Sequence, residues 1–384
     1  MTEPDTVALY VHWPYCARIC PYCDFNVVRD RGRADEQAAL TEAILTDMAA
    51  QAGLMSPRRL ASIFFGGGTP SLMPPDHVRR VIERARALFP GGGEVEITLE
   101  ANPTDAEAAR FAALAEAGVN RLSLGGQALD DAALKFLGRN HSADEAMRAL
   151  DLARSAFPRL SIDLIYDRPG QTVDQWTAEL NRAVDLGFEH VSPYQLTIEP
   201  ETAFGRAYAR GTLIPPDEDR AADLYEATQA VLQARGFTAY EVSNHARGEA
   251  ARSSHNLHVW RGGDYAGVGP GAHGRLTLGR LTLDGVRTAL VAHRRIADYV
   301  AGVAAGAPWS ERQALTPVEA DEERLLLALR TDEGAPAALI ARLDLVQRAR
   351  GLAEQGFLTI ADGRVAASVT GRPVLDAVLK ALLV

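Results

Sequence analysis

The spacing of apolar residues changes regularly along the first two hundred positions. Short β-branched runs alternate with longer stretches rich in Ala, Leu, Glu and Arg. The short runs predict buried strands, and the longer stretches predict helices. The expected strands are Val7–His12, Ile63–Phe65, Val95–Glu100, Arg121–Leu124, Leu160–Ile165 and His190–Leu196.

Helices are expected between these strands. The first is predicted from four apolar residues at helical spacing: Leu40, Ile44, Leu45 and Met48. The other helices are expected over Asp76–Leu88, Asp105–Ala117, Ala143–Ala156 and Val173–Leu186. Gly118 and Gly187 each follow a periodic stretch and mark helix ends. Repeated strand–helix units predict an α/β fold with a parallel sheet and right-handed crossovers.

Such a sheet either curls into a partial (β/α)6 barrel or stays flat and doubly wound, and periodicity does not separate the two. In both, ligands gather at the carboxyl ends of the strands. The chemically unusual residues stand at these ends: Cys16, the run Gly66-Gly67-Gly68-Thr69, Glu100 and Gln127.

The pattern changes at Pro215. A helix over Asp219–Arg235 precedes a stretch rich in Gly, Arg and His, from His245 to Gly279, with little helical pattern. After Leu315 the order reads helix, helix, hairpin, helix, and Asp362-Gly363 suits a type I′ turn. We therefore expect a barrel over 1–214, an α/β extension over 215–314, and an α+β end over 315–384 that closes in a small winged-helix-like module.

Composition narrows the function classes. The net charge of −10 gives no basic field for nucleic acid or anionic membrane, so no nucleic-acid partner is expected. No apolar run reaches the roughly 18 residues of a membrane span, and the acidic start Met1-Thr2-Glu3 does not resemble a secretory signal. A cytoplasmic protein is expected, and its oligomeric state is not fixed by the sequence.

The three cysteines form the strongest chemical signal. Cys16, Cys20 and Cys23 have the spacing C-x3-C-x2-C, and three thiolates on one loop can hold three irons of a [4Fe–4S] cube, which leaves the fourth iron open. A structural zinc normally takes four ligands, and His12 in the preceding strand is a poor fourth. Zinc and incidental buried thiols remain the alternatives.

The motif and its surroundings resemble the radical S-adenosylmethionine (SAM) superfamily. The string from Tyr10 to Asn26 is similar to the oxygen-independent coproporphyrinogen oxidase family and, within it, to the HemW-type haem chaperones. The similarity continues through Phe65–Pro70, Glu100–Pro103, Arg121–Gly125, Leu137–Arg139, Asp163–Tyr166, Pro169–Thr172 and His255–Trp260.

This resemblance implies a TIM-like barrel, a [4Fe–4S] cluster on the cysteines, and SAM. Gly67, Gly68 and Thr69 would contact the methionyl part of SAM. The amide and carbonyl groups of the Gly66-Gly67-Gly68 run are expected to be exposed, although a Gly triplet alone also suits a flexible turn. The remaining implied cofactor contacts are Glu100 and Asp163 for ribose hydroxyls or the amino group, Gln127 and Arg139 for a second SAM, and the cluster-flanking Tyr10 and Tyr22. A surface ion pair for Arg139 and strand packing for Tyr10 are the alternatives.

Two departures separate the chain from the oxidase branch. Phe25 stands where that branch carries a further Cys, and only nine residues precede Tyr10. Both features are shared with the chaperone branch. Its H-N-x-x-Y-W motif appears here as His255–Trp260, with Val259 in place of Tyr.

The resemblance implies haem as cargo. His255, His258 and the nearby His273 are candidate haem ligands, and the alternative is that they are hydrogen-bonded loop histidines. The sequence contains no C-x-x-C-H stretch, so covalent haem attachment of the cytochrome c type is not expected.

The first interpretation is a chaperone that passes haem to an acceptor apoprotein at the inner membrane face. The second is oxidation of coproporphyrinogen III to protoporphyrinogen IX, and a third is another radical SAM reaction, so whether the protein is an enzyme stays open. A nucleotide-binding enzyme is excluded because no G-x-G-x-x-G opens a helix after Gly66.

Overall fold

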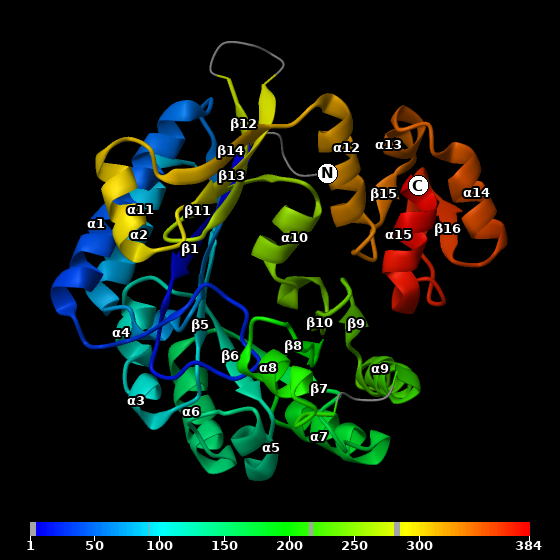
Figure 1. Ribbon diagram of the computed structural model, residues 1–384, viewed down its shortest axis with the longest axis horizontal. Coiled ribbons are helices and arrows are strands. Elements are labelled where there is room, and N and C mark those ends of the chain that lie inside the picture. Colours follow the sequence, from blue (N-terminus) through cyan, green and yellow to red (C-terminus); the bar gives the residue numbers. More distant parts are fainter. Residues whose placement is uncertain (1–4, 92, 215–217, 280–284) are drawn as a thin grey trace.

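A parallel sheet forms the centre of the computed structural model, which describes residues 5–91, 93–214, 218–279 and 285–384 (Figure 1). Each predicted strand of the first half is present, and most extend further than expected. They are β1 (Thr6–Trp13), β4 (Arg59–Gly67), β5 (Glu96–Ala101), β6 (Arg121–Gln127), β7 (Arg159–Tyr166) and β8 (His190–Gln195).

The order of these strands decides between the two predicted architectures. They lie side by side as β1-β4-β5-β6-β7-β8, which is their order along the chain, and every neighbouring pair is parallel. A doubly wound sheet reverses its order at a switch point, whereas winding in one direction curls the sheet. The sheet is therefore a partial TIM-like barrel, and the carboxyl ends of its strands meet at one rim.

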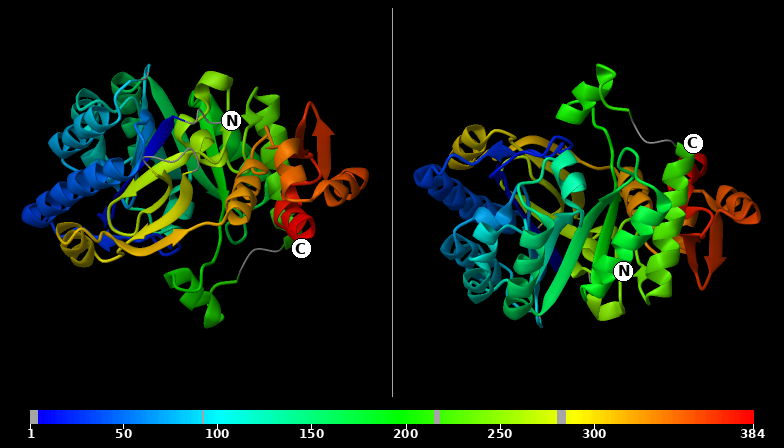
Figure 2. Two further views of the ribbon diagram at one scale, coloured as in Figure 1. Left: turned by 90° about the horizontal axis from the view of Figure 1, so that it is seen from above. Right: turned by 90° about the horizontal axis from the view of Figure 1, so that it is seen from below.

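Helices cover the outer face of this sheet (Figure 1). They are α1 (Ala34–Leu54), α2 (Pro75–Leu88), α3 (Asp105–Ala108), α4 (Phe111–Glu116), α5 (Asp131–Phe136), α6 (Ala143–Ala156), α7 (Val173–Asp185) and α9 (Glu218–Ala234). Helix α8 (Ala203–Ala209) projects from the barrel instead (Figure 2), and its Phe204 contacts Tyr22 of the cysteine loop. Helix α1 buries Leu40, Ile44 and Met48 as predicted. Helices α6 and α7 begin with capping boxes, in which a Ser or Thr and a Glu or Gln three residues on satisfy each other's backbone amides.

The single helix expected over Asp105–Ala117 is wrong, because the chain forms two short helices there. Thr104 caps α3 through Glu107 N–H, and the Arg110 guanidinium then donates to the carbonyls of Leu72 and Met73. These side-chain contacts interrupt the helix and hold Glu107 beneath the rim of the barrel, where its carboxylate accepts from Asn102 N–H at 2.8 Å.

The middle segment extends the same sheet at both edges. Strands β11 (Asp264–Val268), β12 (His273–Leu278), β13 (Val286–Ala292) and β14 (Trp309–Ala314) continue from β1, and β10 (His245–Ala246) and β9 (Thr238–Ala239) continue from β8. Helix α11 (Ile296–Ala304) packs against α1. One hydrophobic core runs through the barrel and this extension.

The stretch expected to lack helical pattern contains a helix, α10 (Ser254–Trp260). It is short, and Ser253 caps it by accepting from Asn256 N–H. It packs against β1, β4 and β11, and its placement depends on contacts distant in sequence. Arg121 holds the approach to α10 by donating to the carbonyls of Ala251 and Arg252.

The C-terminal module lies at one end of the molecule (Figure 2) and has a hydrophobic core of its own. Its elements are α12 (Pro317–Ala328), β15 (Ala335–Pro336), α13 (Ala337–Arg342), α14 (Val346–Glu354), β16 (Leu358–Ala361), β17 (Arg364–Ala367) and α15 (Leu375–Leu383). The hairpin β16–β17 turns at Asp362 and Gly363 with φ of +51° and +72°, the positive pair that a type I′ turn requires. Three helices precede the hairpin rather than the two expected. Throughout the described ranges, every helix is too short or too polar to cross a lipid bilayer.

Candidate functional site

The three cysteines lie on a loop that leaves the carboxyl end of β1. The loop is closed at its base by β2 (Tyr15–Cys16), which pairs in parallel with β3 (Val28–Arg29). Cys16 is buried, and Cys20 and Cys23 are half-buried. Burial raises the pKa of the Cys16 thiol to about 11, against a lowering by its hydrogen bond with Thr69. Burial also raises the pKa of Cys23.

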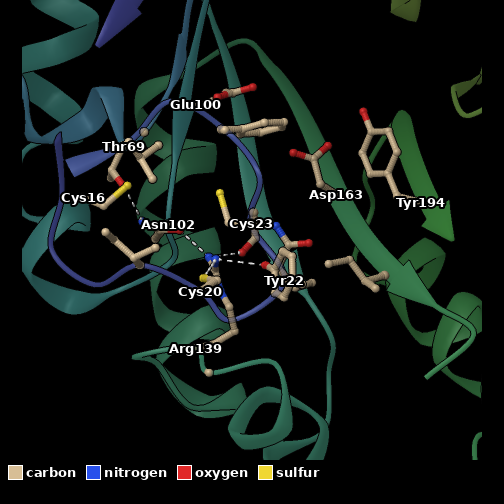
Figure 3. Close-up of a pocket in the computed structure, with 18 of the residues that line it drawn as sticks. Cys16, Cys20, Tyr22, Cys23, Thr69, Glu100, Asn102, Arg139, Asp163 and Tyr194 are labelled. Carbon is tan, nitrogen blue, oxygen red and sulfur yellow. Dashed lines mark hydrogen bonds between the residues drawn. The ribbon is translucent and has the colours of Figure 1, made fainter. Parts of the chain in front are cut away.

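A cavity of about 590 Å³ opens beside this loop at the carboxyl ends of the strands. Figure 3 shows cysteine, acidic and arginine side chains facing it from different segments. With one exception, it gathers every residue that the resemblance assigned to the cluster and SAM: Cys16, Cys20, Cys23, Tyr22, Gly67, Gly68, Thr69, Glu100, Gln127, Arg139 and Asp163. The exception is Tyr10.

Arg139 connects the cysteine loop to two barrel strands. Its guanidinium donates to Cys20 Sγ at 3.3 Å, to the Gly125 carbonyl at 2.9 Å and to the Asn102 side-chain oxygen (Figure 3). Its Nε is buried and has no hydrogen-bond partner within the described residues. Arg139 therefore does not make a surface ion pair. It places a positive charge against a cysteine sulfur and keeps one donor unused.

Two carboxyl groups face each other across the cavity. Burial raises the pKa of Glu100 to about 8, and the neighbouring Asp163 carboxylate raises it further, while a hydrogen bond from Gly67 N–H lowers it. Burial raises the pKa of Asp163 to about 6, against hydrogen bonds from Ser192 and Ser123. Both carboxyl groups are therefore protonated more readily than free ones, which lets the site offer a carboxylic-acid donor as well as a carboxylate acceptor.

The glycine run after β4 is fixed by steric demands. Gly67 has φ +106°, and a Cβ there would lie 2.5 Å from the His12 ring. A Cβ on Gly68 would lie 2.7 Å from the Pro14 backbone. The expectation that the backbone amides of the glycine run are exposed is wrong for Gly68, because its amide donates to Trp13 O at 2.8 Å. The next amide, of Thr69, donates to Tyr15 O at 2.8 Å. These amides bind the cysteine loop to the strand end.

Gln127 ends β6 with φ +64°, an uncommon conformation for a residue other than glycine. The register with β7 shifts between Leu124 and Gln127. The irregularity turns the end of the strand at the cavity, where residues held in such conformations cluster in proteins.

The prediction omitted several residues that line the cavity. Asn102 donates to Thr69 Oγ1 at 3.1 Å and accepts from Arg139, although it lay within a quoted motif. Phe25 and Tyr194 also line it and are 62% and 41% exposed, so both rings are accessible from the cavity. Their signal in the sequence was only their position after the third cysteine and near the end of a predicted strand.

A second cavity, of about 780 Å³, adjoins the first. Both are lined by Asp24, Phe25, Gly67, Glu100, Tyr194 and Ser243. Tyr10 lies here, where its ring stacks on Phe64 with centroids 6.3 Å apart and its hydroxyl donates to His12 Nδ1 at 3.1 Å. The walls are rich in aromatic side chains, which suits a flat apolar ligand.

The two haem-ligand candidates on α10 are buried and hydrogen-bonded. His255 Nδ1 lies 2.9 Å from Ser62 Oγ, and its ring faces the second cavity. His258 Nε2 donates to Asp264 O at 2.8 Å, and its ring does not line either cavity. Burial lowers the pKa of both imidazoles. Their role as haem ligands stays a prediction.

The chemistry of the first cavity fits a [4Fe–4S] cluster with SAM. Each thiolate of such a cube binds a different iron, so the sulfurs need not converge on one point. Within the described ranges, no three metal-binding side chains converge as they would around a single ion. The unused Arg139 Nε suits a carboxylate, and the Glu100–Asp163 pair suits hydroxyl and ammonium groups.

Comparison with known proteins agrees with this geometry. Residues 10–183 match the model of the radical SAM superfamily. The chain is 40% identical over 388 residues to the mitochondrial radical S-adenosyl methionine domain-containing protein 1 of Bos taurus, covering 98% of this chain and 87% of that protein. The chain belongs to the HemN/HemW-like family of radical SAM proteins.

Bacterial members of this family are also similar. The haem chaperone HemW of Escherichia coli is 38% identical over 77% of this chain and 76% of its own length. HemW of Mycobacterium tuberculosis is 33% identical over 98% of this chain and 94% of its own. The solved structure of coproporphyrinogen III oxidase (HemN) from Escherichia coli aligns with a TM-score of 0.80 over 99% of this chain and 91% of that one, at 21% identity, and it supports the fold.

Proposed function

We propose that this protein is a haem chaperone that carries a SAM-coordinated [4Fe–4S] cluster, binds haem, and delivers it to acceptor apoproteins. The similarity to HemW chaperones, which extends over nearly the whole chain in one case, carries this proposal. Phe25 supports it, because the oxidase branch that the sequence resembles carries a cysteine at that position. The adjoining aromatic cavity supplies space for a porphyrin beside the cofactor cavity.

Cys16, Cys20 and Cys23 would hold the cluster, and Gly67, Gly68, Thr69, Glu100, Gln127, Arg139 and Asp163 would surround SAM. A bound cluster and SAM together supply one-electron chemistry. Arg139 donates to Cys20 Sγ, where it would favour the thiolate that binds iron, and orients Asn102 toward Thr69. Burial raises the pKa of both Glu100 and Asp163 next to the position of the cofactor, and the Thr69 amide keeps the base of the cysteine loop against the end of β4.

The acceptor would be a haem-requiring apoprotein, expected at the inner face of a membrane. The protein itself would act in the cytoplasm, although the Bos taurus relative is named as mitochondrial. The net charge of −10 does not favour anionic lipid, so contact with the acceptor protein would determine delivery.

Haem transfer tests this proposal. The anaerobically reconstituted protein is loaded with haem and mixed with apomyoglobin, either directly or across a dialysis membrane. We expect saturable haem binding and transfer that is faster in direct contact than across the membrane. In parallel, the protein is incubated with SAM, a reductant and coproporphyrinogen III. Formation of protoporphyrinogen IX together with 5′-deoxyadenosine, with no haem binding, would overturn the chaperone and establish the oxidase.

A further inference from the structure

The nine histidines differ in how far their ring nitrogens are already engaged. Most are hydrogen-bonded within the barrel or on its outer helices, such as His77 with Thr41 Oγ1 at 3.0 Å and His190 with the Tyr240 hydroxyl at 2.8 Å. A haem ligand must reach the ligand cavity and offer a free ring nitrogen. Three histidines line the second cavity: His12, His255 and His273.

Of these three, His12 has both ring nitrogens engaged and His255 has one engaged and is nearly buried. His12 Nε2 donates to Asn26 O at 2.9 Å and its Nδ1 accepts from Tyr10, so both nitrogens are engaged. His255 is 6% exposed, and its ring lies against Phe64 with centroids 5.1 Å apart. Its contact with Ser62 joins α10 to β4. Its Nε2 is not hydrogen-bonded within the described residues, but a ring that is 6% exposed and packed on Phe64 presents much less of itself to a macrocycle than an exposed side chain does.

His273 differs on each count. It begins β12, is exposed, and makes no side-chain hydrogen bond within the described residues. Its backbone is fixed by pairing with Val291 of β13, so the imidazole projects from a sheet rather than from a loose loop. Partial burial and the charges of Arg275 and Arg294 lower its pKa, against the effect of Glu311. The imidazole is therefore neutral near pH 7 and has a lone pair for a metal.

The surroundings of His273 match the rest of a haem. Tyr265 and Val291 line the same cavity and offer apolar contact for a macrocycle. Arg294 also lines it, is exposed, and its guanidinium makes no ion pair or hydrogen bond in the part of the chain that the structure describes. Arg294 and His273 therefore line the same cavity, and the positive charge of Arg294 lowers the pKa of His273. When the iron of a haem is bound, the propionate carboxylates at the edge of the porphyrin lie a short distance from the iron ligand. The Arg294 guanidinium is suited to bind such a carboxylate.

We propose that His273 is the axial ligand that binds the iron of an iron porphyrin in the second cavity, and that Arg294 pairs with one of its propionates. The step is coordination only: an imidazole nitrogen donates its lone pair to iron, and no electron or proton is transferred. The proposal deepens the proposed chaperone function and rests on it. It gives the haem a position next to Phe25 and Tyr194, which separate this cavity from that of the cluster.

The test is a haem titration of the full-length reconstituted protein, followed by the Soret band and by magnetic circular dichroism. His273→Ala should lose the histidine-ligation signature and weaken haem binding by at least about tenfold. Removing a residue that merely supports a metal ligand already weakens metal binding by about 10- to 100-fold, so the loss of the ligand itself should cost no less. Imidazole added to His273→Gly should restore the signature, which a purely structural defect would not permit. His77→Ala, on an outer helix, is the matched control and should titrate like the wild type.

Arg294→Ala should weaken haem binding a few-fold, as expected for an exposed ion pair, with an unchanged ligation spectrum. Retention of the cluster absorbance and of the unfolding temperature shows that each variant is folded. A His273→Ala protein with wild-type affinity and spectrum would overturn the proposal, as would loss of the signature in His255→Ala or His258→Ala alone. A wild type that binds no haem would instead overturn the chaperone function itself.

Discussion

The guanidinium of Arg139 should tune the reduction potential of the cluster. It lies 3.3 Å from Cys20 Sγ and is half-buried at the cavity. Hydrogen bonds and positive charge at a ligand sulfur stabilise the more negative, reduced form of an iron–sulfur cluster. Arg139→Gln removes the charge but keeps an amide, and Arg139→Lys keeps the charge but loses the planar set of donors.

The size of the effect follows from the contact. A hydrogen bond to a charged group contributes about 1.5–3 kcal/mol, and for a one-electron couple about 59 mV corresponds to a tenfold change, or 1.36 kcal/mol. If the whole interaction favoured the reduced state, Arg139→Gln would lower the midpoint potential by roughly 65–130 mV. The interaction also acts on the oxidised state, so this range is the largest shift that the contact can produce. Arg139→Lys should fall between this variant and the wild type.

The assay is a redox titration of the anaerobically reconstituted protein, monitored by electron paramagnetic resonance. Arg148→Ala is the matched control, because the ion pair of Arg148 with Asp105 joins two side chains that are both more than half exposed. Its potential should equal that of the wild type. Equal potentials in Arg139→Gln and the wild type, at equal iron content, would refute the reasoning about Arg139.

Three further predictions concern stability. Burial raises the pKa of Asp47 from 3.8 to about 6, so the folded protein favours the protonated carboxyl group. The stability of the fold that depends on this protonated form is fully present below about pH 4 and is lost as the pH rises through 6, a difference of about 3 kcal/mol in the free energy of unfolding. Urea unfolding of the wild type and Asp47→Asn between pH 4.5 and 8 should show the wild type losing stability relative to the variant, and parallel curves would contradict this. Gly68→Ala should destabilise the protein by about 1–3 kcal/mol, because the new Cβ would contact the Pro14 backbone. Gly53→Ala should stabilise it by about 0.5–1 kcal/mol, because a Cβ at this position of α1 meets open space. Thermal unfolding compares the two variants, and equal shifts in Tm would be inconsistent with the geometry. Thr172→Ala removes the cap of α7 and should cost about 1 kcal/mol in chemical denaturation, and no loss would argue against the capping box.

Local pattern predicted the elements of the barrel well. The strands from β1 to β8 and the helices between them follow from apolar spacing, and the turn at Asp362-Gly363 follows from its dipeptide. Pattern failed where side chains make contacts distant in sequence. The break between α3 and α4 depends on Arg110 reaching Leu72, and α10 is too short to show a helical period.

The candidate site divides in the same way. The first cavity could be predicted because its residues stand at the carboxyl ends of parallel strands, which share one rim. The second cavity could not, because it joins Tyr10 of β1 to His273 of β12 and Arg330 after α12, and no local pattern brings these together. The occupied amides of Gly68 and Thr69 were missed for a related reason, since their acceptors, Trp13 at the end of β1 and Tyr15 at the base of the cysteine loop, are distant in sequence.

The most direct measurement combines metal analysis with spectroscopy on protein purified without oxygen. The account predicts iron and acid-labile sulfide in equal amounts, and a reduced-cluster resonance that changes when SAM is added, because SAM would bind the iron that Cys16, Cys20 and Cys23 would leave free. Zinc in place of iron, or a resonance that SAM does not alter, would contradict it.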